Sequence, residues 1–115
     1  MIKIKRVYET YSSNDGYRVL VDRLWPRGVS KQKAQIDEWL KEIAPSDELR
    51  KWFNHEVDKW SEFQNRYVTE LNHNSASAEL KQIIKDNQNT TLVYSAHDEQ
   101  HNQAIVLLKW LASAK

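Results

Sequence analysis

Residues 17–28 read YRVLVDRLWPRG, and this stretch decides the fold. From Tyr17 to Trp25 we predict an extended strand with apolar side chains on both of its faces. Those side chains are Val19 and Val21 on one face and Leu20 and Leu24 on the other. This pattern is typical of a central strand that is covered on both sides. Pro26 has no N–H to give to a neighbouring strand, so we expect the strand to end there.

The segments around this strand predict further strands and helices. Ile2 and Ile4 alternate with lysines, as in a half-exposed strand, and Trp60 and Tyr67 belong to an apolar stripe with helical spacing. Residues 36–44 fit a strand or a helix, and we predict a strand. The predicted elements are, in chain order, a strand over 2–8, the strand over 17–25, a helical turn over 31–35 capped by Ser30, a strand over 36–44, a helix starting at Ser46, a helix over 58–72, a helix around Leu80 that ends near Asn87, a strand over 90–96 and a last helix around 104–111.

Strands that alternate with helices favour an α/β fold with a mainly parallel sheet, here of about four strands, and helices on both faces. The chain has two glycines, two prolines and no repeat or Ser/Gly linker, so we expect one domain over 1–115. The sequence leaves strand order and oligomeric state open.

Several classes of protein are excluded or disfavoured by composition. Hydrophobic residues make up 40% of the chain, but no apolar run approaches the about 20 residues of a membrane span. The N-terminal residues alternate like a strand and carry no signal-peptide pattern, so we expect a cytoplasmic protein. The absence of cysteine excludes disulfides, thiol nucleophiles and Cys-ligated zinc.

In open parallel sheets, ligands bind beyond the carboxyl ends of the strands. The first loop at such an end contains Asp22, Arg23, Trp25, Arg27 and Gly28. One interpretation is that Asp22 pairs with an arginine and pins the loop, because a buried charge needs a partner. The other is that Arg23 and Arg27 grip a phosphate or carboxylate, Gly28 lets the backbone approach it, and Trp25 forms an apolar wall.

The second loop joins the last predicted strand to the last helix. We predict Asp98 as the N-cap of that helix, and His101 and Asn102 as side chains that point toward the Asp22 loop. Asp22 and His101 are the acid/base candidates. His97 and His101 are four residues apart, but no third ligand is evident, so we predict neither a metal nor a cofactor.

Arg50 and His55 flank an aromatic pair, Trp52 and Phe53, in the helix that starts at Ser46. They either reach the predicted site from the helical side or serve structural roles, with Arg50 paired to an acid and His55 near the helix end.

A resemblance to a known family covers essentially the whole chain, and the motifs that carry it occur in the family's order. They are residues 18–28, Ala44-Pro45-Ser46, Leu49-Arg50-x-Trp52-Phe53-x-His55, Trp60-x-x-Phe63, Tyr67, Thr91-Leu92-Val93-Tyr94-x-Ala96-x-Asp98 and His101-Asn102-x-Ala104. The chain is identified on this pattern as a member of the YeaO-like proteins, a bacterial branch of domain-of-unknown-function family 488. The resemblance implies a small three-layer α/β domain of the bacterial cytoplasm and assigns no reaction.

Other branches of that family carry a Cys-His-Arg cluster near the start of the last helix. This chain has His101-Asn102-Gln103 there, so the resemblance does not extend a thiol or phosphatase-like mechanism to it.

Three functions remain open at this point. The leading one is a site that binds, and in its fullest form also processes, a small anionic or phosphorylated ligand. The alternative is a regulatory module for nucleic acid or protein that uses the basic N-terminal third, where residues 1–35 hold eight Lys or Arg against three Asp or Glu, together with Trp25 and Trp39. In the third, Asp22, Arg23, Arg50 and Asp98 form a purely structural network.

Overall fold

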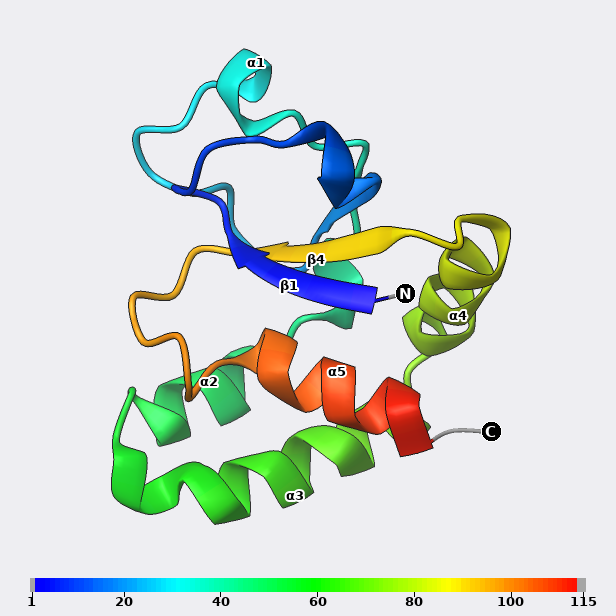
Figure 1. Cartoon of the computed structure of the whole chain (residues 1–115). Helices are drawn as coiled ribbons and strands as arrows, with labels where there is room; N and C mark the ends of the chain where they lie inside the picture. Colours follow the sequence, from blue (N-terminus) through cyan, green and yellow to red (C-terminus); the bar gives the residue numbers. More distant parts are fainter. Residues whose placement is uncertain (1, 114–115) are drawn as a thin grey trace.

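The computed structural model describes residues 2–113, and its strands form one sheet in which all the pairings are parallel. Met1 and residues 114–115, which the predicted domain includes, lie outside the described residues. The strands are β1 (Ile2–Arg6), β2 (Tyr17–Leu20), β3 (Glu38–Trp39) and β4 (Thr90–Tyr94). Their order across the sheet is β1-β4-β2-β3, so the last strand in the chain is central. Figure 1 shows β4 next to β1.

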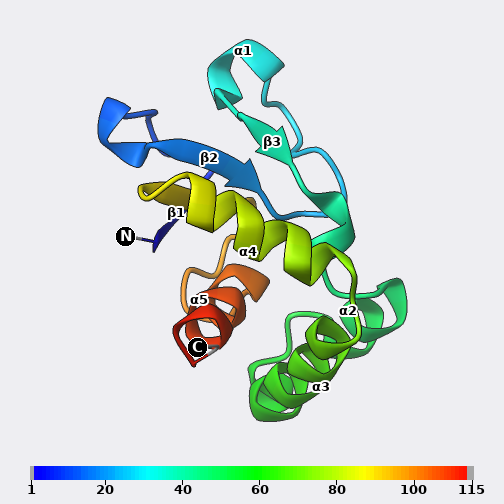
Figure 2. The ribbon, with the colours of Figure 1, turned by 90° about the vertical axis from the view of Figure 1, so that its right-hand side faces the viewer.

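The helices cover the two faces of the sheet unequally. They are α1 (Lys31–Ala34), α2 (Asp47–Phe53), α3 (Trp60–Asn72), α4 (Ala76–Asp86) and α5 (Gln103–Ser113). Figure 1 shows α3 and α5 below the sheet and the short α1 above it. In Figure 2, α2 and α3 lie together under the same face that α4 and α5 cover. The predicted α/β fold with helices on both faces is confirmed, with most of the helical mass on one face.

The main core lies between the sheet and the four longer helices. Val19 and Val21 from the β2 side and Leu92 from β4 are fully buried there. They pack with Leu80 of α4 and Leu107 of α5, both also fully buried. Because strand side chains alternate between faces, the remaining strand residues must be covered from the other side.

A smaller cluster covers the opposite face. Leu20 and Val93 point into it and are fully buried, and they pack with Val7 and with Ala34 of α1. Trp25 packs against the same cluster and is half-buried. The predicted assignment of Val19 and Val21 to one face and Leu20 to the other is therefore confirmed.

Two predicted helix caps are present. The Ser30 side chain accepts a hydrogen bond from the backbone N–H of Lys33, and that of Ser46 accepts one from Leu49. Each satisfies an N–H group that the first turn of a helix leaves unpaired.

The strands end earlier than predicted because their ends depend on their neighbours. β4 ends at Tyr94, and the last hydrogen bonds to it come from the backbone N–H groups of Val7 and Val21. After Val7 and after Val21 the chain leaves the sheet. The prediction that the strand continues to Trp25 is wrong, and Leu24 is 72% exposed.

The strand predicted over 36–44 is also mostly wrong. Only Glu38–Trp39 pairs with β2, because β2 itself ends at Leu20. A 3₁₀ turn at Lys41–Ile43 then leads to α2. Among the helices of residues 2–113, none is both long and apolar enough to cross a bilayer.

Candidate functional site

A cleft of about 880 Å³ opens at the carboxyl ends of β2 and β4. Its walls come from the loops that follow these two strands, from α2 and from the start of α5. Its volume falls within the about 300–1,000 Å³ of pockets that hold small organic molecules. Seven of the ten residues predicted for the site line it, namely Asp22, Arg23, Arg50, His55, Asp98, His101 and Asn102.

Asp22 lies at the floor of the cleft and is 7% exposed. Its carboxylate accepts a hydrogen bond of 2.9 Å from the backbone N–H of Ser95 and another from the Gln103 side chain. It therefore joins the end of β2 to the end of β4 and the start of α5. Of the two interpretations, the pair between Asp22 and an arginine is not formed, because neutral donors satisfy the carboxylate.

The environment of Asp22 also changes its proton affinity. Burial raises the pKa of Asp22, and the hydrogen bonds from Ser95 and Gln103 offset this only in part. The cleft therefore contains a carboxyl group that holds its proton to a higher pH than a solvated aspartate does.

Arg23 lies beside Asp22 and points toward α2. Its terminal NH2 group donates to the carbonyl oxygens of Ala44 and Pro45, at 3.1 and 3.2 Å. Its Nε is buried and has no hydrogen-bond partner within the part of the chain that the structure describes. The nearest carboxylate oxygen belongs to Asp47, at 3.9 Å, which is too long for a hydrogen bond.

Arg50 faces the same carboxylate from α2. Its NH2 atom lies 3.5 Å from the Asp47 Oδ1, and both side chains are more than half exposed. Two guanidinium groups, those of Arg23 and Arg50, thus converge on one solvated carboxylate without forming a close bidentate pair with it. An arrangement of this kind can accept a further anion.

The loop between β4 and α5 forms the opposite wall. Asp98 accepts hydrogen bonds from the backbone N–H groups of Gln100 and His101, at 2.9 and 3.0 Å, and its other oxygen lies 2.9 Å from the His101 Nδ1. These contacts, above all the Gln100 N–H, lower the pKa of Asp98. The His101 ring also meets the Trp60 ring edge-on, with the centroids 5.2 Å apart.

Asp98 was predicted to cap the last helix, and this is wrong. The helix begins at Gln103, and the side-chain oxygen of Asn102 accepts the N–H of Ile105 at 3.1 Å. Asp98 instead closes the turn before the helix, because the chain makes that additional turn between β4 and α5.

Aromatic rings form the apolar part of the cleft. Phe53 and Phe63 line it and stack with their centroids 4.4 Å apart, and the His55 ring lies 6.3 Å from Phe53. Sequence reasoning missed both phenylalanines because they also belong to the apolar stripes of α2 and α3. The proximity of Phe53 to the predicted residues Arg50 and His55 was the one available signal.

The backbone at the edge of the cleft is strained. Asn54 and His55 are consecutive residues with φ values of 47° and 57°. Asparagine tolerates this left-handed region better than most residues, but histidine has a Cβ that opposes it. Such conformations are concentrated at functional sites.

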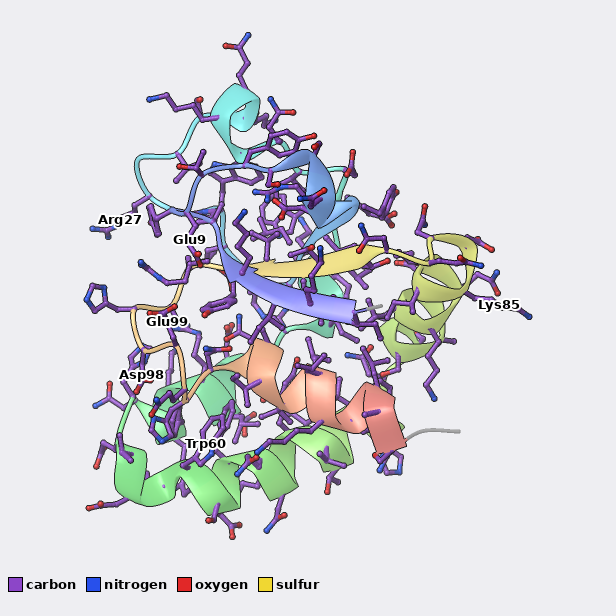
Figure 3. All side chains as sticks on the ribbon, in the orientation of Figure 1. Glu9, Arg27, Trp60, Lys85, Asp98 and Glu99 are labelled. Carbon is purple, nitrogen blue, oxygen red and sulfur yellow. The ribbon has the colours of Figure 1, made fainter. Side chains whose placement is uncertain are left out.

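Three predicted residues lie outside the cleft lining. Trp25 donates from its Nε1 to the carbonyl oxygen of Val29 at 2.7 Å and packs in the smaller core cluster. The Arg27 side chain extends outward from the molecule (Figure 3), and Gly28 has a φ of 73° on the same exposed loop. The predicted grip of Arg23 and Arg27 on one anion is therefore not formed, because the chain leaves the sheet after Val21 and turns toward the other face.

Within residues 2–113, no group of three or more His, Cys, Asp or Glu side chains is arranged to hold a metal ion. The convergent groups of the cleft are guanidinium groups and aromatic rings, which suit an organic anion.

Comparison with known proteins places the chain in a family. A family model described as "Inactive DUF488-N3 subclade" matches residues 1–115. The "Uncharacterized protein YeaO" of Escherichia coli (strain K12) is 49% identical over 113 residues, which is 97% of each chain. The "Uncharacterized protein Rv3073c" of Mycobacterium tuberculosis (strain ATCC 25618 / H37Rv) is 37% identical over 105 residues, 91% of this chain and 89% of that one.

No solved structure matches the chain. The protein is thus a YeaO-like member of family DUF488 and belongs to its inactive DUF488-N3 subclade.

Proposed function

We propose that the cleft binds a small organic anion and that the protein acts as a binding protein without converting its ligand. The observation that carries this proposal is the buried, unpartnered Nε of Arg23 within the described chain, placed beside the loosely engaged guanidinium group of Arg50. A buried donor without a partner costs about 1–3 kcal/mol. A ligand recovers this energy when Asp47, which faces the Nε at 3.9 Å, moves aside and a ligand oxygen takes its place.

The anionic group of the ligand lies between Arg23 and Arg50 in this proposal. Asp47 now sits at 3.9 and 3.5 Å from the two guanidinium groups and is solvated. A carboxylate or phosphate on the ligand would bring acceptor oxygens to the shorter distances of charge-assisted hydrogen bonds, about 2.7–2.9 Å. Asp47 would then turn toward solvent.

The remainder of the ligand is apolar or aromatic. A cleft of about 880 Å³ has far more room than an inorganic ion needs, and the largely buried Phe53 and Phe63 contribute apolar atoms to its lining. The rings of His55 and His101 also line the cleft. An aromatic ring of the ligand could contact them in the offset or edge-on arrangements that aromatic pairs favour.

Two arguments favour binding without conversion. Asp22 and His101, the acid/base candidates, are already engaged by Ser95 and Gln103 and by Asp98 respectively. The subclade that matches the chain is described as inactive. In this proposal Asp22 shapes the floor of the cleft and His101 forms part of its wall.

Calorimetry and thermal shift with phenyl phosphate, benzoate and inorganic phosphate test the proposal. We expect the two aromatic anions to bind more tightly than inorganic phosphate. Arg50→Gln should weaken them by roughly 10- to 150-fold, the equivalent of one charge-assisted hydrogen bond of about 1.5–3 kcal/mol. Arg27→Gln, which removes the same charge outside the cleft, is the matched control and should bind as the wild type does.

Equal binding by wild type and Arg50→Gln, or no binding of any of these anions, would reject the proposed site. Release of phenol from phenyl phosphate by the wild type would contradict the part of the proposal that excludes conversion.

A further inference from the structure

A second surface, outside the cleft, alternates cations with aromatic rings. We call it the cation–aromatic strip, and its residues are Arg6, Tyr8, Arg27, Trp25, Trp39 and Lys41. Arg6 and Trp39 are the last residues of β1 and β3, and the others come from the segments that follow β1, β2 and β3. The six residues therefore gather at the carboxyl ends of these strands.

Direct contacts connect the strip. The Arg6 guanidinium lies 4.9 Å from the centre of the Tyr8 ring, and the Tyr8 hydroxyl donates to the carbonyl oxygen of Arg27 at 3.0 Å. Two residues before Arg27, the Trp25 ring meets Trp39 edge-on at 5.5 Å. The strip ends with the Lys41 ammonium, 5.3 Å from the centre of the Trp39 ring.

The two exposed rings of the strip are held in place. Tyr8 is 48% exposed and Trp39 is 37% exposed. Each is anchored by one edge, Tyr8 through its hydroxyl to Arg27 and Trp39 through its Nε1 to the carbonyl oxygen of Asp22 at 2.7 Å. Large aromatic surface is therefore presented to solvent in a fixed orientation, which reduces the entropy lost when a flat group stacks on it.

Acidic residues adjoin both ends of the strip, Glu9 beside Tyr8 and Glu38 beside Trp39, but not its middle. On the nearby part of the N-terminal third, Lys5 and Arg18 share the carboxylate of Asp15, which offsets one of their two positive charges. Residues 24–36, in contrast, contain Arg27, Lys31 and Lys33 and no acid, and all three cations are exposed. This segment adds a positive field beside the strip.

We propose that the cation–aromatic strip binds single-stranded nucleic acid, with bases stacked on Tyr8 and Trp39 and with phosphates bound by Arg27, Lys31 and Lys33. Proteins that bind single strands combine a basic surface with aromatic side chains on which bases stack. A lipid surface or an acidic peptide would use the cations but offers no flat bases for the rings, so the rings favour the nucleic acid. This surface is separate from the cleft, because neither Arg27 nor Trp25 lines the cleft.

Fluorescence anisotropy with labelled oligothymidine and oligouridine of about 16 nucleotides, near the largest site size of related binders, tests the proposal. We expect binding to weaken as salt rises, with a slope of log affinity against log salt of about −0.7 for each phosphate contact. The triple variant Arg27→Gln/Lys31→Gln/Lys33→Gln should make this slope shallower by roughly two. Tyr8→Leu should weaken binding about ten-fold while the salt dependence stays the same.

The matched control is Lys81→Gln/Lys85→Gln/Lys109→Gln, which removes the same charge from α4 and α5. Lys85 lies at the far side of the molecule from Arg27 (Figure 3). This control should bind the oligonucleotides with the wild-type slope. If both triple variants weaken binding equally, net charge and not the strip is responsible, and the proposal fails.

Other outcomes also overturn the proposal. One is that the protein leaves the anisotropy of both oligonucleotides unchanged at low salt. The other is that it binds tightly to phosphatidylserine vesicles and to neither oligonucleotide. Failure here is distinguishable from failure of the cleft, because the Arg27 triple variant should still bind phenyl phosphate and Arg50→Gln should still bind the oligonucleotides. Comparison of the two oligonucleotides shows whether DNA or RNA is preferred.

Discussion

Asp15 joins two cations that come from different strands. Its carboxylate lies 3.1 Å from the Lys5 ammonium and 2.5 Å from the guanidinium group of Arg18, which is 1% exposed. Arg18 also donates to the carbonyl oxygens of Ala34 and Gln35, so it fixes α1 to the sheet. Burial alone would raise the pKa of Asp15, but the Ser12 N–H and the two cations outweigh it and lower the pKa.

We therefore expect Asp15→Asn to reduce the free energy of unfolding by about 3–5 kcal/mol, because it leaves the buried Arg18 without a counter-charge. Urea denaturation at neutral pH measures this. In the wild type, the stability from Asp15 is present above the pKa of the unfolded chain and is lost as the pH falls through the lowered folded pKa. Asp86→Asn, at an exposed helical carboxylate, should change stability by less than about 0.5 kcal/mol.

Asp22 should show the opposite dependence on pH. Its folded pKa is raised, so the folded protein holds the proton more tightly than the unfolded chain does. Its contribution to stability is therefore complete below the unfolded pKa of about 4 and declines as the pH rises through the folded pKa. Asp22→Asn should remove this decline, which denaturation of both proteins at a series of pH values between about 4 and 7 would reveal. Parallel curves for the two proteins would contradict the assignment.

At the residue scale, the sequence predicted which polar residues meet at the ends of the strands. Asp22, Arg23, Asp98, His101 and Asn102 were brought together by the rule that ligands bind at the carboxyl ends of parallel strands. Their partners were not predictable, because Ser95 and Gln103 reach Asp22 across more than 70 positions of sequence. Arg27 was misplaced because the direction of its loop depends on where the sheet ends.

The two glycines show how local conformation and packing combine within one element. Gly16 and Gly28 have nearly the same φ, 68° and 73°. A Cβ on Gly16 would collide with the backbone carbonyl of Asn89, which precedes β4, whereas a Cβ on Gly28 would meet no atom within 4 Å. The turn before β2 therefore requires glycine both for its positive φ and for the space that a Cβ would occupy. The exposed loop requires glycine only for its positive φ.

Gly28→Ala should lower the free energy of unfolding by about 1–2 kcal/mol, the cost of a left-handed conformation for a residue with a Cβ. Gly16→Ala should cost more than this, because its ψ of −137° places it outside the left-handed region and an added Cβ would overlap with Asn89. Chemical denaturation of the two variants side by side measures the difference. Equal losses would show that Asn89 moves away without cost.

Helices were predicted more closely than strands, for a physical reason. The stripe of Trp60, Phe63 and Tyr67 and the caps at Ser30 and Ser46 are local signals, and α1, α2 and α3 formed near the predicted positions. A strand ends where its neighbour ends, and the neighbour is distant in sequence. This explains why the strands predicted over 17–25 and 36–44 were too long.

At the scale of the whole molecule, β4 connects the two cores. Leu92 points into the main core and Val93 into the smaller cluster, and both are fully buried. Because neighbouring residues of one strand belong to different cores, neither core can lose its packing without disturbing the other. The parallel sheet was predictable from alternating strands and helices, whereas the central place of the last strand was not.

We expect the molecule to unfold in one transition as a result. Leu92→Ala should reduce the free energy of unfolding by about 2–5 kcal/mol. Far-UV circular dichroism and tryptophan fluorescence should give the same midpoint for the wild type, for Leu92→Ala and for Val93→Ala. Separate midpoints in the Val93→Ala variant would show that the smaller cluster unfolds independently.

The strand order has a further consequence for synthesis on the ribosome. β1 and β2 do not pair with each other, and each pairs with β4. Both N-terminal strands therefore expose unpaired edges until Thr90–Tyr94 has left the exit tunnel, long after their own residues have emerged. Unpaired strands are sites of aggregation during folding, and pairing over such distances is slow. We therefore expect the nascent chain to depend most on chaperones from the emergence of β2 until β4 has left the tunnel, when four helices can form but β1 has no strand to pair with.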